Sequence, residues 1–542
     1  MNFTANRLPF EQTGYFSRLV TDYLKGSDFL TSFYAHPVSL AGMEAAMRAR
    51  ELFPTDRNTL VQVLQDQYKD QPVKETVDNN IRQLLEKNTF TITTAHQPAI
   101  FTGHLYFIYK ILHVIKLAAD LSARYPDRKF IPVYFMGSED ADLEELGHIY
   151  LDGEKIPWNT RQTGAVGRMN TKGLDEVLQR IEGEFAAKPY GPALVQLLKT
   201  CYLESATVQT ATFKLLHHLF GEYGLIVLIA DERRFKTMMK PVFKDDLIQH
   251  LPFQKTEQTV KRLSEQYTVQ ANPREINLFY MKDDIRERID FKDGQYKVHN
   301  TSISFSREKL EAELDQYPER FSPNVILRGL FQETILPNIA FVGGGGETAY
   351  WFELKSLFDH YQVPFPMLIL RNSFLLIRDF WRTKMEKAGL HQETVFQKEE
   401  LLLEQMVKDH SSNQLNLEKE IQQLETYYDS LKQISESVDE TLAQHVEALR
   451  SKALKGVSEL EKKILRAEKR NFADARNRIH EVREALFPMD GLQERVDNFI
   501  PWYANYGQAF LDLIYTNSLC LEQEFVVLEE TPNATAAGSF VR

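Results

Sequence analysis

Cysteine is scarce in this sequence, which has only Cys201 and Cys520 among its 542 residues. Two thiols are too few for a structural zinc site built on cysteine, so we expect no zinc. Such scarcity is also typical of a protein from a reducing compartment. It therefore predicts a cytoplasmic location.

Long hydrophobic runs and an excess of basic charge are also missing. No run of about 18 apolar residues occurs, and the first residues lack the basic and apolar regions of a signal peptide. We therefore expect no membrane segment. The formal net charge is −12, which argues against nucleic acid as the main partner, because phosphate backbones bind basic faces. A local basic pocket for a small anion remains compatible with this charge.

The sequence does contain several short apolar runs separated by segments of helical spacing. The runs that predict buried strands are 90–95, 129–136, 224–230, 339–342 and 366–370. Polar or glycine-rich residues follow each of them. Alternation of this kind predicts an α/β fold with a Rossmann-like, doubly wound parallel sheet.

We divide the chain into three parts. Residues 1–384 would form the Rossmann-like core, with a helical insertion at about 150–218 and a small antiparallel insertion at about 255–320. The second insertion is predicted from short alternating strands and the hairpin signal Asp293-Gly294. Residues 385–500 would form a long α-helical coiled coil, and residues 501–542 a segment that returns to the core.

The coiled-coil prediction rests on two features: helix-breaking residues are scarce, and apolar residues recur at helical spacing. Residues 390–487 contain no proline and only one glycine, Gly456. Apolar residues recur at spacings of three and four from Leu417 to Ile464, with charged and amide residues between them. This apolar seam must be buried, either within a hairpin or against another subunit. We expect both, and hence a homodimer through the coiled coil.

The first candidate site lies where the strand at 90–95 leads into a helix predicted from Gly103 to Arg124. His96, Gln97, Gly103 and His104 lie at this junction, and Thr102 is a suitable N-cap. Helix N-termini favour anions, and parallel sheets bind ligands at such strand exits. The alternative is an ordinary turn with two hydrogen-bonded histidines.

Two further strand exits carry charged residues. Ser138, Glu139 and Asp140 follow the strand at 129–136, and Arg234 follows the strand at 224–230. Glu139, Asp140 or Asp142 could hold an ammonium group or Mg²⁺. Equally, Ser138 and Asp140 could cap the next helix, and the sequence leaves both interpretations open.

Four consecutive glycines form the third candidate site. They are not a P-loop, because no Gly-Lys-Ser/Thr follows. A run of glycines is costly to order, which favours close approach of the backbone to a ligand over a tight packing turn. The predicted binding residues here and at the next strand exit are Gly343, Gly344, Gly345, Gly346, Glu347, Tyr350, Trp351, Arg371 and Asn372.

A further prediction concerns the base of the coiled coil. Arg382, Lys384 and Lys387 lie at its start, and Tyr506 lies in the segment expected to return to the core. Domain junctions often hold pockets. These residues could therefore form a second crevice for an anion or a nucleotide.

Several of these stretches together resemble one known family, the bacillithiol biosynthesis cysteine-adding enzymes, or cysteine ligases, called BshC. The stretches are Leu8 to Phe10, Ala95 to Pro98, Thr102 to His104, Gly137 to Asp140 and Gly343 to Trp351. The resemblance spans the whole chain, including the coiled coil. The family's glycine loop usually carries a proline where this chain has Gly345.

The resemblance implies a cytosolic ligase that joins cysteine to glucosaminyl-malate through an amide bond. It also implies a Rossmann core related to class I aminoacyl-tRNA synthetases. Amide formation from a carboxylate and an ammonium is unfavourable in water, so the carboxylate needs activation. ATP or another nucleotide, with Mg²⁺, could supply it.

We assign catalytic roles to four residues on this basis. His104 and His96 would stabilise developing negative charge, and His96 could accept the proton of the attacking amine. Glu139 or Asp140 would hold an ammonium group, while Arg371 or Arg234 would bind the malate carboxylates. The alternative function is a nucleotide- or metabolite-binding scaffold that recruits partners through its coiled coil.

Overall fold

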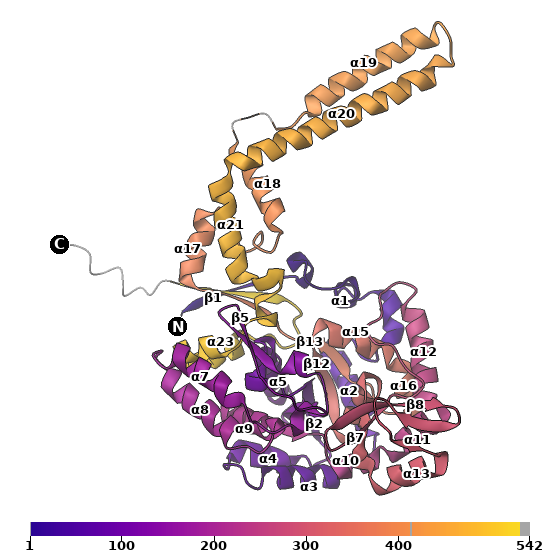
Figure 1. Cartoon of the computed structure of the whole chain (residues 1–542), viewed down its shortest axis with the longest axis vertical. Helices are drawn as coiled ribbons and strands as arrows, with labels where there is room; N and C mark the ends of the chain where they lie inside the picture. The colour runs from indigo at the N-terminus through magenta and orange to yellow at the C-terminus, as the bar shows by residue number, and fades with distance from the viewer. Residues whose placement is uncertain (1, 412, 414, 532–542) are drawn as a thin grey trace, which may run out of the picture.

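The computed structural model describes residues 2–411, 413 and 415–531 of the chain. A mixed α/β body carries a long helical arm (Figure 1). At the centre of the body is a sheet of five strands in the order β13-β12-β2-β3-β6. Every neighbouring pair is parallel, and the strands are β2 (Thr89–His96), β3 (Lys129–Met136), β6 (Ile226–Ile229), β12 (Asn338–Gly343) and β13 (Met367–Leu370).

The strand order confirms the predicted Rossmann-like, doubly wound sheet. The chain enters the sheet at β2, builds outward through β3 and β6, and then returns to the other side of β2 for β12 and β13. The direction of building therefore reverses between β2 and β12. Open α/β sheets bind ligands beyond the carboxyl ends of the strands at this reversal.

Helix α5 (Tyr106–Arg124) packs against β2 and β3 and begins later than predicted. Phe101, Thr102 and Gly103 have φ values of 48°, 69° and 62°, so the chain makes a left-handed turn before the helix. The prediction of Thr102 as N-cap is therefore wrong. Thr102 is buried within the turn, and its hydroxyl has no hydrogen-bond partner among the described residues.

The other helices of the body surround this sheet on both faces (Figure 1). Helix α2 (Leu40–Glu51) packs on β12 and β13. The remaining helices before β12 are α1 (Arg18–Leu24), α3 (Arg57–Tyr68), α4 (Glu75–Gln83), α6 (Leu143–Leu146), α7 (Leu174–Phe185), α8 (Gly191–Leu203), α9 (Val208–Phe220), α10 (Arg233–Met238), α11 (Lys240–Gln249), α12 (Leu251–Leu263), α13 (Arg307–Gln316) and α14 (Val325–Ile335). Helices α15 (Gly345–Glu353) and α16 (Lys355–Tyr361) connect β12 to β13.

A second sheet of five antiparallel strands lies beside the central one. Its order is β10-β9-β8-β7-β11. Asp293 and Gly294 connect β8 to β9 with φ values of 55° and 76°, as a two-residue hairpin requires. The strands are β7 (Leu278–Lys282), β8 (Ile285–Lys292), β9 (Gln295–Val298), β10 (Ser304–Phe305) and β11 (Phe321–Pro323). A separate hairpin joins β4 (His148–Leu151) and β5 (Glu154–Pro157).

The coiled coil is a helical hairpin that projects from the body (Figure 1). Helix α19 (Glu418–Glu436) packs along α20 (Leu442–Asn471), and Arg450 pairs across the hairpin with Asp429 at 3.1 Å. With 30 residues in α20, the arm extends about 45 Å. Helices α17 (Asp379–Lys387), α18 (Glu399–His410) and α21 (Ala473–Leu486) connect it to the body.

The end of the described chain packs on the body. Strand β15 (Phe525–Glu530) lies between β1 (Phe3–Leu8) and β14 (Phe374–Ile377), after α22 (Ile500–Tyr506) and α23 (Gln508–Asn517). Residues 532–542 of the predicted C-terminal segment lie outside the described residues. Among the helices that the structure describes, none has the length and apolar character needed to cross a membrane.

Candidate functional site

A cavity of about 330 Å³ opens at the carboxyl ends of β2, β3 and β12. It lies at the reversal of strand order, where the fold itself places ligands. Its volume is at the lower end of the range for small-molecule sites. The predicted site residues that line it are His96, Gln97, Ser138, Glu139, Asp140, Gly344, Gly346, Glu347, Tyr350 and Arg371.

Other predicted residues lie away from the cavity, for identifiable reasons. Trp351 is fully buried and packs against aromatic rings of the core, 4.7 Å from Phe341 between ring centroids. Arg234 is bound on the surface by Asp66 and Glu232. The side chain of Asn372 is buried and accepts the backbone N–H of Leu519 at 3.0 Å. Gly343 and Gly345 are also not among the lining residues.

The predicted anion site at the start of α5 is not open to a ligand. The backbone N–H of Leu105 donates to the carbonyl of Asp497 at 2.7 Å, and Asn498 donates to the carbonyls of Phe101 and Gly103. A segment that follows the coiled coil thus covers this turn. Gly103 and His104 consequently do not line the cavity.

His104 instead lies beside the cavity wall. Its Nδ1 is 3.3 Å from the carbonyl oxygen of Val496, and its ring centroid is 5.8 Å from that of Tyr106. Burial lowers the pKa of His104, and nearby His148 lowers it further, although the Val496 carbonyl opposes this. His104 thus neighbours Tyr106, which lines the cavity, without lining the cavity itself.

The second predicted crevice is not formed by the residues named for it. Lys384 pairs with Glu481 on α21, and the hydroxyl of Tyr506 donates to Glu530 at 3.3 Å. Lys387 is exposed. A hollow does exist in this region, but of the residues named for the crevice only Arg382 lines it, together with others such as His391 and Glu529.

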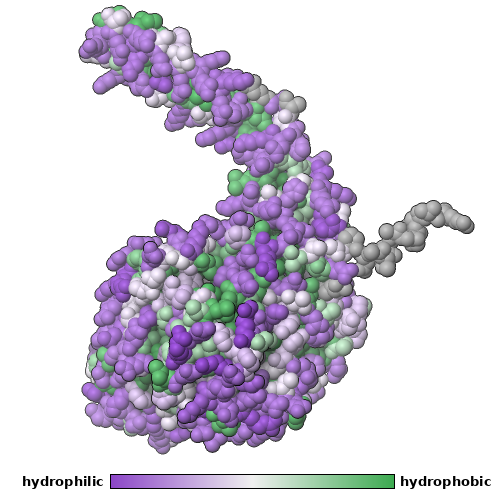
Figure 2. Space-filling view, turned by 180° about the vertical axis from the view of Figure 1, so that it is seen from behind, coloured by the Kyte–Doolittle hydropathy of each residue, from purple (hydrophilic) through white to green (hydrophobic). Residues whose placement is uncertain are grey.

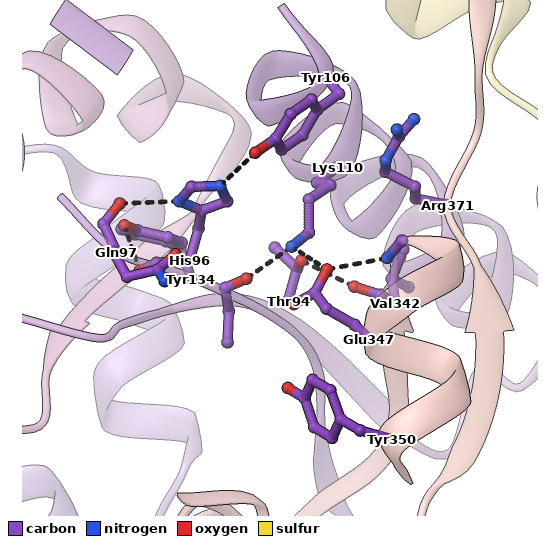
Figure 3. Close-up of polar contacts among 12 residues, drawn as sticks. Thr94, His96, Gln97, Tyr106, Lys110, Tyr134, Val342, Glu347, Tyr350 and Arg371 are labelled. Atoms are coloured by element: carbon purple, nitrogen blue, oxygen red, sulfur yellow. Dashed lines mark hydrogen bonds and ion pairs between the residues drawn. The ribbon is translucent and has the colours of Figure 1, made fainter. Parts of the chain in front are cut away.

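His96 ends β2 and is held at both ring nitrogens (Figure 3). Its Nδ1 lies 2.9 Å from the carbonyl oxygen of Gln97, and its Nε2 lies 2.9 Å from the hydroxyl of Tyr106. Burial and the nearby Lys110 lower the pKa of His96 to about 4. The imidazole is therefore neutral at pH 7 and has no free nitrogen facing the cavity.

Lys110 and Glu347 form an ion pair between the first and fourth strand exits. Lys110 projects from α5, is fully buried, and donates to the carbonyl of Ala95 and to Glu347 Oε2, both at 2.6 Å. The same Oε2 accepts the N–H of Gly344 at 2.8 Å. Burial raises the pKa of Glu347, but Lys110 and the Gly344 N–H outweigh this and lower it, so the group is a carboxylate. Figure 3 shows the side chain of Lys110 reaching this carboxylate.

Carboxylates form one wall of the cavity. Asp140 accepts the side-chain amide of Gln97 at 3.0 Å and lies 3.8 Å from Arg286. Glu139 forms an ion pair at 2.5 Å with the buried Lys236, so its carboxylate already has a cationic partner. Glu145 is exposed at the rim. Burial raises the pKa of Glu145, as do nearby carboxylates, with Asp142 foremost.

Arginines also line the cavity. Arg371 binds Glu494 at 2.7 Å and is stacked over the ring of Tyr106 at 5.0 Å. Arg328 contacts the hydroxyl of Tyr350, and its side chain has no carboxylate partner among the described residues. Arg495 forms no salt bridge in the described part of the chain, although the carboxylates of Glu494 and Glu347 lie near enough to act on its pKa. Arg328 and Arg495 are thus available to bind an anion.

Sequence reasoning missed several lining or supporting residues. Lys110 carried a usable signal, because it is the one charged residue in the apolar first part of α5, from Tyr106 to Leu112. Tyr106, four residues earlier, lies on the same helix face. Arg286, Arg328 and Arg495 come from the antiparallel sheet, from α14 and from the segment after the coil. Nothing local in the sequence marks these three arginines.

The described residues contain no group of three or more His, Cys, Asp or Glu side chains arranged to hold a metal ion. The acids nearest to such a role are Asp140 and Glu145 at the cavity. Carboxylate oxygens of this kind suit Mg²⁺, which usually takes only one or two protein carboxylates and completes its shell with water and phosphate.

Comparison with known proteins identifies the family. Residues 3–372 match the model of the BshC N-terminal Rossmann-like domain, and residues 374–530 match that of the C-terminal coiled-coil domain. Three relatives, each named "Putative cysteine ligase BshC", are 38% identical to this chain. The proteins from Flavobacterium johnsoniae, Christiangramia forsetii and Flavobacterium psychrophilum align over 96%, 97% and 94% of this chain and 99%, 99% and 96% of their own. The chain therefore belongs to the BshC family of bacillithiol biosynthesis.

Proposed function

We propose that this protein is a ligase that joins cysteine to glucosaminyl-malate by an amide bond between the cysteine carboxylate and the sugar amine. The name of its relatives supports a cysteine ligase. The observation that carries the proposal is the cavity at the reversal of strand order, whose lining contains both arginines and carboxylates. Both substrates carry an ammonium or amine together with carboxylates.

The charge distribution suggests how the substrates would lie. Arg328 and Arg495, which form no salt bridge among the described residues, would bind malate carboxylates or phosphate oxygens. Asp140 and Glu145 would attract the ammonium group of cysteine. Arg371 is less suited to bind a carboxylate directly, because its guanidinium is already paired with Glu494.

A nucleotide would supply the activation that the cysteine carboxylate needs. Arg328 and Arg495 are the side chains that would hold its phosphates, and the first turn of α15, with Gly346 exposed, adds the positive end of a helix dipole. An accompanying Mg²⁺ would take one of these two carboxylates, Asp140 or Glu145, and leave the other for the ammonium group of cysteine.

The arm supports a second part of the proposal, homodimerisation. Figure 2 shows it covered mainly by hydrophilic residues, with separate hydrophobic groups at its far end and along its length. Exposed apolar side chains on the two helices include Tyr427, Ile434, Leu449 and Leu460. A second copy of the arm would bury them, whereas a recruiting scaffold would use them to bind a different protein.

The test of the enzymatic proposal is product formation by purified full-length protein. Cysteine, glucosaminyl-malate, Mg²⁺ and one of several nucleoside triphosphates are mixed, and the amide product is detected by mass spectrometry. Arg328→Gln should lower kcat/KM by about tenfold to a hundredfold, since hydrogen bonds to charged groups contribute about 1.5–3 kcal/mol. Absence of product with every nucleotide would refute the proposal for the isolated chain.

Two further variants sharpen the result. Arg233→Gln is the matched control, because Arg233 pairs with Glu319 on the surface and does not line the cavity. It should retain full turnover. His104→Ala tests the predicted role of that histidine, and full turnover would remove His104 from the catalytic residues.

A further inference from the structure

The contacts of His96 determine which atoms of its ring carry a proton. Nδ1 faces the carbonyl oxygen of Gln97 at 2.9 Å. A carbonyl oxygen can only accept a hydrogen bond, so Nδ1 must carry the proton and donate it. Whether Nε2 also carries a proton then depends on the charge of the ring. It does in the imidazolium and does not in the neutral imidazole.

The ring is neutral, so Nε2 carries no proton. Burial is the main cause of the low pKa of His96, and Lys110 adds to it. An unprotonated Nε2 can only accept a hydrogen bond. Its partner at 2.9 Å is the hydroxyl of Tyr106, which must therefore donate its single proton to His96.

The hydroxyl of Tyr106 then has only lone pairs to offer to the cavity. Tyr106 lines the cavity, and His96 is the one hydrogen-bond partner of its hydroxyl among the described residues. Its ring is fixed from the other side by the guanidinium of Arg371, 5.0 Å from the ring centroid. The oxygen is thus a positioned acceptor, although an isolated tyrosine could donate or accept.

We propose that Tyr106 Oη accepts a hydrogen bond from the amine of the sugar substrate, and that His96 is the positioning residue that makes Tyr106 an acceptor. This inference rests on the proposed function, because that function supplies the amine. Carboxylate and phosphate oxygens have no proton to donate, so this part of the cavity disfavours them. Anionic groups are thereby directed toward Arg328 and Arg495.

The assignment changes the predicted role of His96. A proton on the attacking amine cannot pass directly to an imidazole whose two nitrogens are both engaged. The group that touches the amine is Tyr106, and His96 acts behind it. The amine is held with one N–H directed at Tyr106, which restricts its orientation before it attacks the cysteine carbonyl.

The experiment compares binding of glucosaminyl-malate with binding of its 2-deoxy analogue, in which hydrogen replaces the amine. Titration calorimetry on the full-length protein measures both. The Kd of wild type should be about tenfold or more lower for glucosaminyl-malate than for the analogue, as expected for a hydrogen bond from a charged or polar donor. Tyr106→Phe should lose most of that preference while still binding the malate part.

Tyr150→Phe provides the matched control. Tyr150 belongs to the same aromatic group, with its ring centroid 6.3 Å from that of His104, but it does not line the cavity. It should keep the wild-type preference. Tyr106→Phe with an unchanged preference would overturn the proposal.

A second measurement reports the state of His96 in the wild-type protein itself. Nitrogen-15 NMR of histidine-labelled wild-type protein reports the tautomer of His96, with the His96→Gln spectrum used for assignment. The Nδ1–H tautomer is expected at neutral pH, and the Nε2–H tautomer or the imidazolium would overturn the inference. Failure of the ligase proposal is distinguishable, because it would appear as absence of product from wild type, whatever the tautomer.

Discussion

Lys110 shows how a single residue connects two distant segments of this chain. Its side chain is 1% exposed, and it holds Glu347 in α15 while bonding to the last residues of β2. A charge buried this deeply is tolerated only when it is paired and fully hydrogen-bonded. Lys110 thereby fixes the positions of the two strand exits that flank the cavity.

Lys110→Met should destabilise the protein by about 3 kcal/mol, because it leaves the Glu347 carboxylate largely buried without its cation. The measurement is the midpoint of urea unfolding at pH 7. Lys25→Met is the control, since Lys25 and Glu11 form a pair whose side chains are 57% and 60% exposed, and it should cost less than about 1 kcal/mol. Equal effects of the two substitutions would contradict the structural role of Lys110.

At the scale of elements, α15 is held by a glutamate at each end. Glu347 in its first turn accepts the N–H of Gly344 and the ammonium of Lys110. Glu353 in its last turn is fully buried, and its Oε1 accepts the N–H groups of Gln270 and Ala271. The helix that carries the glycine run is therefore anchored to the segment that leads into the antiparallel sheet.

Glu353 predicts a specific dependence of stability on pH. Burial raises its pKa from 4.5 to about 7, although the two backbone N–H groups oppose this. Between these pH values the folded protein keeps a proton that the unfolded chain has lost. Stability should therefore fall as the pH rises through this interval.

Glu353→Gln should remove that dependence while keeping both hydrogen bonds, because a glutamine oxygen can occupy the place of Oε1. Wild type and variant should be nearly equal in stability near pH 4.5. Near pH 8 the variant should be more stable by on the order of 2 kcal/mol. Urea unfolding at the two pH values measures this. The same difference in stability at both pH values would be inconsistent with titration of Glu353. The control is Glu86→Gln, which changes an exposed glutamate and should alter stability little at either pH.

At the scale of the whole molecule, the body and the arm differ in how completely they bury their apolar side chains. The body buries a continuous apolar core, whereas in α19 none of the residues is buried and in α20 only Val446 is. Two paired helices therefore leave much of their apolar seam in contact with solvent. In the proposed homodimer, a second copy of the arm would cover this seam.

Leu449→Glu combined with Leu460→Glu should convert the proposed dimer to a monomer, because both leucines are about half exposed on α20. Sedimentation-velocity ultracentrifugation measures the oligomeric state. Lys452→Glu changes charge on the same helix without removing an apolar side chain and should leave the dimer intact. A monomeric wild type would overturn the proposed dimer.

The local sequence predicted helices and strands well where a single hydrophobic pattern dominated a segment. The strands before His96 and Gly137, the glycine-rich entry to α15 and the helices of the arm all follow from residues close together in the chain. Prediction failed where a distant segment satisfied a local group. Asn498 and the carbonyl of Asp497 close the turn at Gly103, and core aromatic rings surround Trp351.

The sequence alone therefore determined the doubly wound sheet, the coiled coil and the strand exits at which a ligand could bind, because hydrophobic period and glycine content are local properties. Only the tertiary structure decided which side chains share the cavity. Arg286, Arg328 and Arg495 come from three different parts of the chain, and their meeting depends on how those parts pack. The acceptor role of Tyr106 likewise depends on packing, because burial of His96 sets the charge of the ring that receives its proton.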